Sequence, residues 1–377
     1  MSIPWSGSAC FSVFIYFHIL FYHASALLLP SVHAAFSRPV CHIIADNVKR
    51  NKCECFRSTW TDYKWYYLLK NKKITEVLLM KYFHGYQKKH SFFEGWYLKH
   101  QSPDGVLALI PAYHIDRQGK PSASLQIITN TESWVIPCSA DQFRAASGLF
   151  YVNLGTSTFA EQGIHLDIAT KEVTLTGHLS YGPFTPPSYD IMGPFCAVPF
   201  MQCRHGVLSL SHRLSGQLVL NRKKLNFDGG LGYIEKDWGR SFPSRYVWTQ
   251  CTWTDKKTKA PCCVMLSVAD IPFAGTHFNG SVGSVLFRGK EYRLATYKGL
   301  KILEFTDREL LVSQGGLMLH VNLIKDQPLS LAAPSFGSMS RTIKESAACQ
   351  VRYQFFYQEK KIFDILCHHA GFESQIM

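Results

Sequence analysis

The feature that most constrains the fold is a series of short apolar segments separated by turn residues, with no sustained helical period between them. Val106–Ile115, Ser124–Thr129, Gly148–Leu154 and Glu172–Ser180 follow one another closely, and the last alternates strictly as EVTLTGHLS. Alternation of apolar and polar residues is typical of a strand with one buried face. Closely spaced strands with little helix indicate a sandwich or a barrel, so we predict an all-β chain.

The length of the chain suits two domains of ordinary size or one large β domain. A chain of 377 residues is too long for one small core, and its 46% hydrophobic and 14% aromatic content supplies ample apolar surface to bury. Strand-like segments continue to a final pair, Gln350–Tyr357 and Lys361–Cys367. We predict an N-terminal β domain over residues 80–230 and a C-terminal β domain over residues 231–377.

Residues 1–79 do not share this pattern. The run Phe11–Pro30 is apolar and about as long as a membrane-spanning or signal segment, but no Lys or Arg precedes it and two histidines interrupt it. The codons of Thr75–Val77 can contain GGAGG, a bacterial ribosome-binding sequence, at a suitable distance before Met80. We therefore predict that residues 1–79 are translated upstream sequence or a disordered leader. An anchor or export signal in the apolar run is the alternative.

Charge and cysteine usage exclude some functions. The net charge of +13 is spread thinly, without a basic run, a zinc-finger spacing or an RNA-binding pattern, so we do not expect nucleic acid as a partner. The charge allows peripheral contact with an anionic membrane, although a soluble basic surface is the simpler interpretation. Of the 12 cysteines, four precede Met80 and the other eight follow it, without paired C-x-x-C spacing. We expect buried reduced thiols, no metal, and a reducing, cytoplasmic location.

Three further features have two interpretations each. Gly182–Pro199 is rich in Pro and Gly and cannot be regular structure, and its apolar side chains favour a loop packed over a pocket rather than a solvated linker. In Phe92–Tyr97, Glu94 is either a buried functional carboxylate or an edge residue facing water, and strand spacing favours the edge. His205, near the start of a strand, either contacts a ligand or forms hydrogen bonds within its loop.

The densest group of chemically useful side chains is Gly232–Cys251, which reads GYIEKDWGRSFPSRYVWTQC. We predict a strand, a tight turn and a second strand. Side chains of a strand alternate between its faces, so Tyr233, Glu235 and Asp237 share one face and Lys236 lies on the other. Two carboxylates on an aromatic face have perturbed pKa values if they are buried, which is typical of acid chemistry. A structural corner with solvated carboxylates is the alternative.

Four motifs together resemble the tocopherol cyclase family. They are FFEGWY at Phe92–Tyr97, DIMGPF at Asp190–Phe195, CRHGVLSLSHRLSG at Cys203–Gly216, and the stretch Gly232–Cys251. They occur in the order of the family and at similar separations. The resemblance implies a lipocalin-like fold in which two β-barrel or β-sandwich domains surround an apolar cavity. It implies a more distant similarity to carotenoid hydratases.

The resemblance also implies a reaction. The family closes a chromanol ring on a prenylated hydroquinone: an acid protonates the alkene of the tail, and the phenolic oxygen traps the tertiary carbocation, without a metal or an organic cofactor. Asp237 and Glu235 are the candidate catalytic acids, because neighbouring carboxyls can raise the pKa of one of them. Aromatic faces stabilise a cation by about 0.5–2 kcal/mol each. The candidate substrate-binding residues are Glu94, Trp96, Tyr233, Trp238, Arg240, Tyr246, Trp248, Gln250 and His205.

Two other functions use the same features. One is the addition of water to an isoprenoid alkene, and the other is binding of an apolar small molecule without catalysis. In all three cases the expected partner is an apolar, isoprenoid-like molecule. A positive charge beside the acids would oppose a raised pKa, so the position of Lys236 on the opposite face matters for the catalytic interpretation.

Overall fold

Strands make up most of the regular structure. The computed structural model describes residues 82–198, 201–273 and 275–376, and in them 22 strands are joined by turns and four short 3-10 helices. Residues 80–377 form one compact unit. The predictions for Phe11–Pro30 and for residues 1–79 lie outside the described residues. Among the residues described, no helix is long and apolar enough to span a membrane.

The first sheet contains 12 strands in the order β4-β3-β2-β1-β12-β10-β9-β8-β7-β6-β5, with β11 paired to β10. At its centre, β12 lies between β1 and β10 and is antiparallel to both. Its strands are β1 (Phe92–Ser102), β2 (Gly105–Ile115), β3 (Pro121–Thr129), β4 (Ser133–Cys138), β5 (Phe143–Ala145), β6 (Tyr151–Leu154), β7 (Ser157–Ala160), β8 (Gly163–Ala169), β9 (Thr174–Tyr181), β10 (Cys203–Leu220), β11 (Lys223–Asn226) and β12 (Leu231–Gly239).

The second sheet contains ten strands in the order β16-β15-β14-β13-β22-β21-β19-β18-β17, with β20 paired to β21. The last strand, β22, lies between β13 and β21. The strands are β13 (Tyr246–Thr254), β14 (Pro261–Phe273), β15 (Thr276–Phe287), β16 (Lys290–Ala295), β17 (Lys301–Phe305), β18 (Glu309–Gln314), β19 (Leu317–Lys325), β20 (Leu329–Ser335), β21 (Ser338–Tyr357) and β22 (Lys360–Gln375). Two antiparallel sheets confirm the predicted all-β class.

The chain changes sheets within the stretch that the sequence singles out. The predicted strand, turn and strand are confirmed: β12 ends at Gly239 and β13 begins at Tyr246. A Cβ atom on Gly239 would lie 2.1 Å from the carbonyl oxygen of Gln202, so only glycine fits there. The predicted division at residues 230 and 231 falls at the start of β12, which is a strand of the first sheet.

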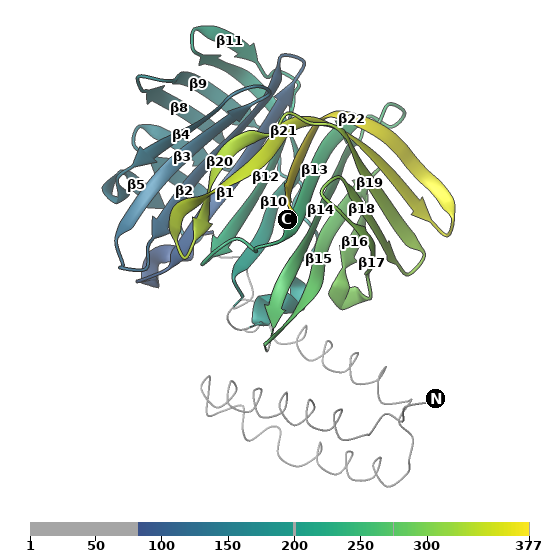
Figure 1. Ribbon diagram of the computed structural model, residues 1–377. Coiled ribbons are helices and arrows are strands. Elements are labelled where there is room, and N and C mark those ends of the chain that lie inside the picture. The colour runs from purple at the N-terminus through teal and green to yellow at the C-terminus, as the bar shows by residue number, and fades with distance from the viewer. Residues whose placement is uncertain (1–81, 199–200, 274, 377) are drawn as a thin grey trace, which may run out of the picture. The chain divides into compact units, whose positions relative to one another are not determined.

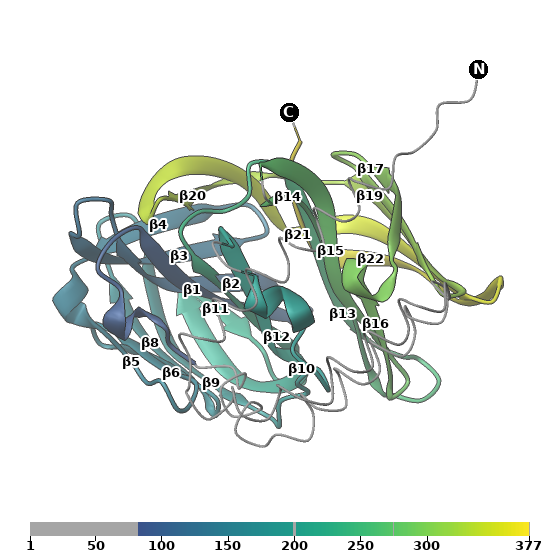
Figure 2. The same cartoon turned by 90° about the horizontal axis from the view of Figure 1, so that it is seen from below.

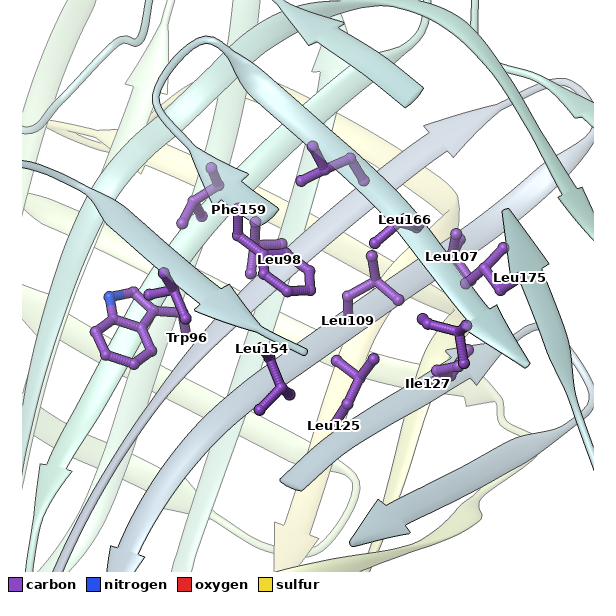
Figure 3. Packing of buried hydrophobic residues seen from close by; sticks show 14 of the residues in the cluster. Trp96, Leu98, Leu107, Leu109, Leu125, Ile127, Leu154, Phe159, Leu166 and Leu175 are labelled. Carbon is purple, nitrogen blue, oxygen red and sulfur yellow. The ribbon is translucent and has the colours of Figure 1, made fainter. Parts of the chain in front are cut away.

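The two sheets lie on opposite sides of the unit (Figures 1 and 2), and β20 reaches across to contact β3 and β4. A hydrogen bond from Gln126 Nε2 to the carbonyl oxygen of Ala332 (2.9 Å) joins them there. Side chains alternate along β1, so its two faces border different parts of the protein. Trp96 and Leu98 point into the core of the first sheet (Figure 3), whereas Tyr97 belongs to a core cluster that also contains Trp248 and Ile343 of the second sheet.

Candidate functional site

A cavity of about 170 Å³ lies between the two sheets. It is smaller than the roughly 300–1,000 Å³ of pockets that enclose drug-sized ligands, so it suits one ring or the end of a longer molecule. Most of its wall is apolar and comes from both sheets and the loop that follows β9, and it includes Phe93, Ile110, Met192, Phe195, Ile271 and Leu331. Several ionisable side chains interrupt this wall: His205, Glu235, Asp237, Glu345 and Glu373.

The described part of the predicted loop, residues 182–198, packs against the cavity, as the sequence predicts. Ile191 and Met192 are buried, and Met192 and Phe195 line the cavity. Arg293 of β16 connects the loop to the second sheet: its Nη2 donates to the carbonyl oxygen of Asp190 (3.1 Å), and its guanidinium lies 3.8 Å from the centre of the Tyr189 ring.

Strand pairing brings the acidic residues of β12 and His205 together. In the register of β12 with β10, His205 lies opposite Asp237; on its other side β12 pairs with β1, where Gly95 lies opposite Asp237. His205 Nδ1 lies 2.9 Å from Asp237 Oδ1, and its Nε2 lies 3.3 Å from Glu235 Oε2. The imidazole therefore bridges the carboxylates of Glu235 and Asp237, which lie two residues apart and so project from the same face of the strand.

Glu235 is held at one oxygen atom by three neighbours. Its Oε2 accepts hydrogen bonds from the hydroxyl of Tyr233 (2.5 Å) and from Nε1 of Trp248 (3.2 Å), and His205 approaches the same atom. Glu235 is buried, whereas the side chain of Asp237 is 26% exposed. Hydrogen bonds to an ionised group are roughly twice as strong as neutral ones, so this carboxyl is firmly oriented.

The two carboxylates keep His205 protonated. Burial by itself would lower the pKa of His205, but the negative charges of Glu235 and Asp237 outweigh burial and raise the pKa well above its usual value. His205 is therefore an imidazolium at neutral pH, with Nδ1–H donated to Asp237 and Nε2–H directed at Glu235. The donor atoms of His205, Glu235 and Asp237 lie within 4.8 Å of one another, which is also compact enough to hold a metal ion. A metal ion would have to displace the proton from the imidazole nitrogen that it binds.

Two further acids in the cavity wall were not identified from the sequence. Glu345 of β21 lies opposite Glu373 of β22, and both are buried. Burial raises the pKa of Glu345 to about 7, and burial together with the charge of Glu345 raises the pKa of Glu373 well above its usual value. The hydroxyl of Tyr246 donates to Oε1 of Glu373. No motif marks either residue, and the neighbours of Glu345 in the chain, Lys344 and Ser346, are polar, so the local sequence gives no signal.

Five of the predicted site residues line the cavity: His205, Glu235, Asp237, Tyr246 and Trp248. Tyr233 does not line it but is buried and bonds to Glu235. All six lie on β10, β12 or β13, where these strands face the gap between the sheets.

The other predicted residues lie elsewhere. Glu94 is not an edge residue facing water, because it is fully buried and pairs with Lys236 (Oε1 to Nζ, 2.7 Å) on the opposite face of β12. The position of Lys236 on that face agrees with the prediction. Trp96 packs into the core of the first sheet, and Trp238 stacks on His84 at 4.6 Å.

Gln250 and Arg240 are also outside the cavity. The side chain of Gln250 accepts a hydrogen bond from Lys99 Nζ (3.1 Å) and donates to the hydroxyl of Thr252 (2.6 Å), so it joins strands inside the protein. Arg240 is exposed just after β12 ends. The alternation of side chains along a strand assigns these residues to the correct faces of the sheet, but it does not show which of two buried faces borders a cavity.

Comparison with known proteins supports the resemblance seen in the motifs. A family model described as tocopherol cyclase-like matches residues 178–270, which contain His205, Glu235, Asp237 and Trp248. A protein of Oryza sativa subsp. japonica, named "Probable tocopherol cyclase, chloroplastic", is 23% identical over 134 residues. That match covers 35% of this chain and spans about a quarter of the length of the relative (25%). The predicted similarity to tocopherol cyclases is confirmed over this central segment.

Solved structures with a similar outline are distant in sequence. Kievitone hydratase from Nectria haematococca superimposes with a TM-score of 0.47 at 10% identity, covering 78% of this chain and 92% of that chain. The crystal structure of CghA gives a TM-score of 0.46 at 9% identity, covering 76% of this chain and 90% of that chain.

Proposed function

We propose that this chain is an acid catalyst that protonates the alkene of an apolar isoprenoid and closes a chromanol-type ring on a prenylated hydroquinone. The observation that carries the proposal is the position of Glu235: a buried carboxyl, oriented by Tyr233, Trp248 and His205, at the wall of an apolar cavity. Similarity to tocopherol cyclases over residues 178–270 supports the choice of reaction.

The cluster offers a proton source. The imidazolium of His205 carries an acidic proton on Nε2, 3.3 Å from Glu235 Oε2. In the proposed reaction this proton passes through the Glu235 carboxyl to the less substituted alkene carbon. Asp237 orients His205, and the phenolic proton released on ring closure restores the imidazolium. General acid catalysis of this kind contributes roughly 10²–10⁴-fold to a rate.

The cavity also suits the cation that follows. Protonation leaves a tertiary carbocation, and the phenolic oxygen of the substrate attacks it, so that a carbon–oxygen bond forms and the phenolic proton is released. Phe93, Phe242 and Tyr246 form a connected set of rings at the cavity, with centroids 5.4 and 6.0 Å apart. Each aromatic face that contacts the cation lowers its free energy by about 0.5–2 kcal/mol.

The test is turnover of a prenylated hydroquinone by the wild type and by Glu235→Gln, with the products separated and weighed by mass spectrometry. The proposal predicts a cyclised product with the mass of the substrate, and a loss of at least about 100-fold in the variant. A product heavier by one water would establish an alkene hydratase instead. Tight binding without any product would establish a binding protein, and wild-type turnover in Glu235→Gln would exclude Glu235 as the acid.

A further inference from the structure

Four chain segments meet at one end of the two sheets: residues 88–91, 115–120, 240–243 and 334–337. The amide of Ser91 donates a hydrogen bond to the carbonyl oxygen of Asp116 (2.8 Å). The amide of Gly337 donates to the carbonyl oxygen of Arg240 (2.8 Å), and a Cβ atom on Gly337 would collide with the carbonyl oxygen of Ile115. These contacts join the four segments into one continuous surface.

The wall of the cavity reaches the exterior at this end. Phe242 lines the cavity and is partly exposed, and so does Met339, just after the fourth segment. Phe278 of β15 also lines the cavity and is 39% exposed. The hairpin of β14 and β15 extends beyond the start of β13, so Phe278 lies at the same end. We call the four segments and Phe278 the mouth surface.

Basic side chains gather on the mouth surface. Residues 88–91 and 115–120 contribute four exposed cations, which are Lys88, Lys89, Arg117 and Lys120. The one acidic residue of these two segments is Asp116, whose Oδ1 accepts a hydrogen bond from the amide of Lys120 (2.8 Å). This part of the rim therefore carries a net positive charge, which complements an anionic partner.

An exposed aromatic ring lies among these cations. Phe336, in the turn between β20 and β21, is 40% exposed, and the guanidinium of Arg117 lies 3.8 Å from the centre of its ring. Apolar rings beside basic groups are typical of surfaces that bind at the interface between lipid and water. Because Arg117 covers one face of the ring, Phe336 suits insertion between acyl chains better than stacking on a nucleobase.

We propose that the mouth surface docks on an anionic lipid bilayer. Lys88, Lys89 and Lys120 contact the headgroups, while Phe336 and Phe278 enter the acyl region. An apolar ligand then passes from the bilayer into the cavity without crossing water. The inference goes beyond the proposed function, because it depends on the apolar wall of the cavity and the charge of its rim and not on the reaction inside.

The test is partitioning of the full chain onto vesicles of phosphatidylcholine mixed with phosphatidylglycerol and onto vesicles of phosphatidylcholine alone, measured by co-sedimentation. The ratio of the two partition coefficients cancels any binding that does not depend on lipid charge. Each basic residue at an anionic surface strengthens binding about fivefold. The combined variant Lys88→Gln, Lys89→Gln, Lys120→Gln should therefore lower the ratio by about 100-fold.

A second variant tests the aromatic contact. Full burial of a phenylalanine side chain strengthens binding by roughly 10–100-fold. Because 40% of Phe336 is exposed, Phe336→Ala should weaken partitioning onto the mixed vesicles by about threefold to sixfold. Unchanged partitioning would show that this ring does not enter the bilayer and would overturn the docking geometry.

The matched control removes the same charge from the opposite end of the second sheet. Lys256 and Lys257 are exposed in the turn after β13, and Lys360 is exposed at the start of β22. The nine residues of β13, at about 3.3 Å each, separate this turn from the mouth surface by about 30 Å. That distance exceeds the Debye length of about 8 Å, so Lys256→Gln, Lys257→Gln, Lys360→Gln should keep the wild-type ratio.

The outcomes decide between partners. A ratio that falls in the mouth variant and not in the control supports the docking surface. No preference of the wild type for the anionic vesicles, or an equal fall in the control, overturns it, and so does a single-stranded oligonucleotide that binds more tightly than the vesicles. Turnover of a hydroquinone dispersed in detergent needs no docking, so its absence would count against the proposed function and not against this surface.

Discussion

The bridge between His205 and the two carboxylates can be tested by removing one of them. In Asp237→Asn the charge 2.9 Å from His205 Nδ1 is replaced by an amide, while Glu235 remains. An opposite charge at such a distance changes a pKa by about 1–3. We therefore expect the pKa of His205 to fall by that amount, which corresponds to about 1.4–4 kcal/mol at 1.36 kcal/mol for each pKa unit.

The assay is an NMR titration of the His205 ring, assigned by comparison with His205→Gln. Stability gives a second measurement with a defined sign. Because the pKa of His205 is raised in the folded state, its contribution to stability is fully present below about pH 6.5 and is lost as the pH rises through the folded-state value. Asp237→Asn should therefore lose most stability at mildly acidic pH, and its deficit should shrink at higher pH.

Asp270→Asn is the control, because the side chain of its partner His277 is 60% exposed. An exposed pair contributes about 0–1 kcal/mol, so this variant should differ from the wild type by no more than that. An unchanged pKa of His205 in Asp237→Asn, or a stability deficit that grows with pH, would refute the electrostatic account of the cluster.

Three other results are expected. Glu94→Gln leaves the ammonium group of Lys236 buried without its carboxylate and should lower the free energy of unfolding by about 3–5 kcal/mol in urea titrations. The protein that remains folded should keep its turnover. A free energy of unfolding equal to that of the wild type would contradict the buried pair. Trp248→Phe removes a donor to Glu235 and should lower kcat/KM by about 5–100-fold, and an unchanged value would show that this bond does not orient the acid. EDTA should leave turnover unchanged because the proposed proton transfer uses only side chains of the protein. Inactivation that added metal reverses would show that the cluster binds a metal.

The two-residue repeat of side chains in a strand explains what the sequence predicted correctly. Strict alternation places Glu235 and Asp237 on one face of a strand and Lys236 on the other, and the structure has this arrangement. The glycine and proline after the strand predicted its end, which occurs at Gly239. The packing of the loop over residues 182–198 followed from its apolar side chains. Each of these is a local property, so neighbouring residues suffice to predict it.

What the sequence did not predict depends on pairing between distant strands. Glu345 and Glu373 reach the cavity because β22 pairs with both β13 and β21. The local sequence predicts an edge position for Glu94. It is buried instead because β12, more than a hundred positions later in the chain, brings Lys236 beside it. Strand alternation assigns residues to faces, but the register of distant strands decides which face borders the cavity and which charges meet there.

The most direct test of the central claim is the fate of the proton. Turnover of a prenylated hydroquinone in D₂O should give a cyclised product that carries one deuterium, bound to the alkene carbon that receives the proton from the cavity acid, with no other change in mass. NMR and mass spectrometry of the product measure this. A cyclised product without deuterium, or a product that has lost hydrogen, would contradict acid catalysis at Glu235.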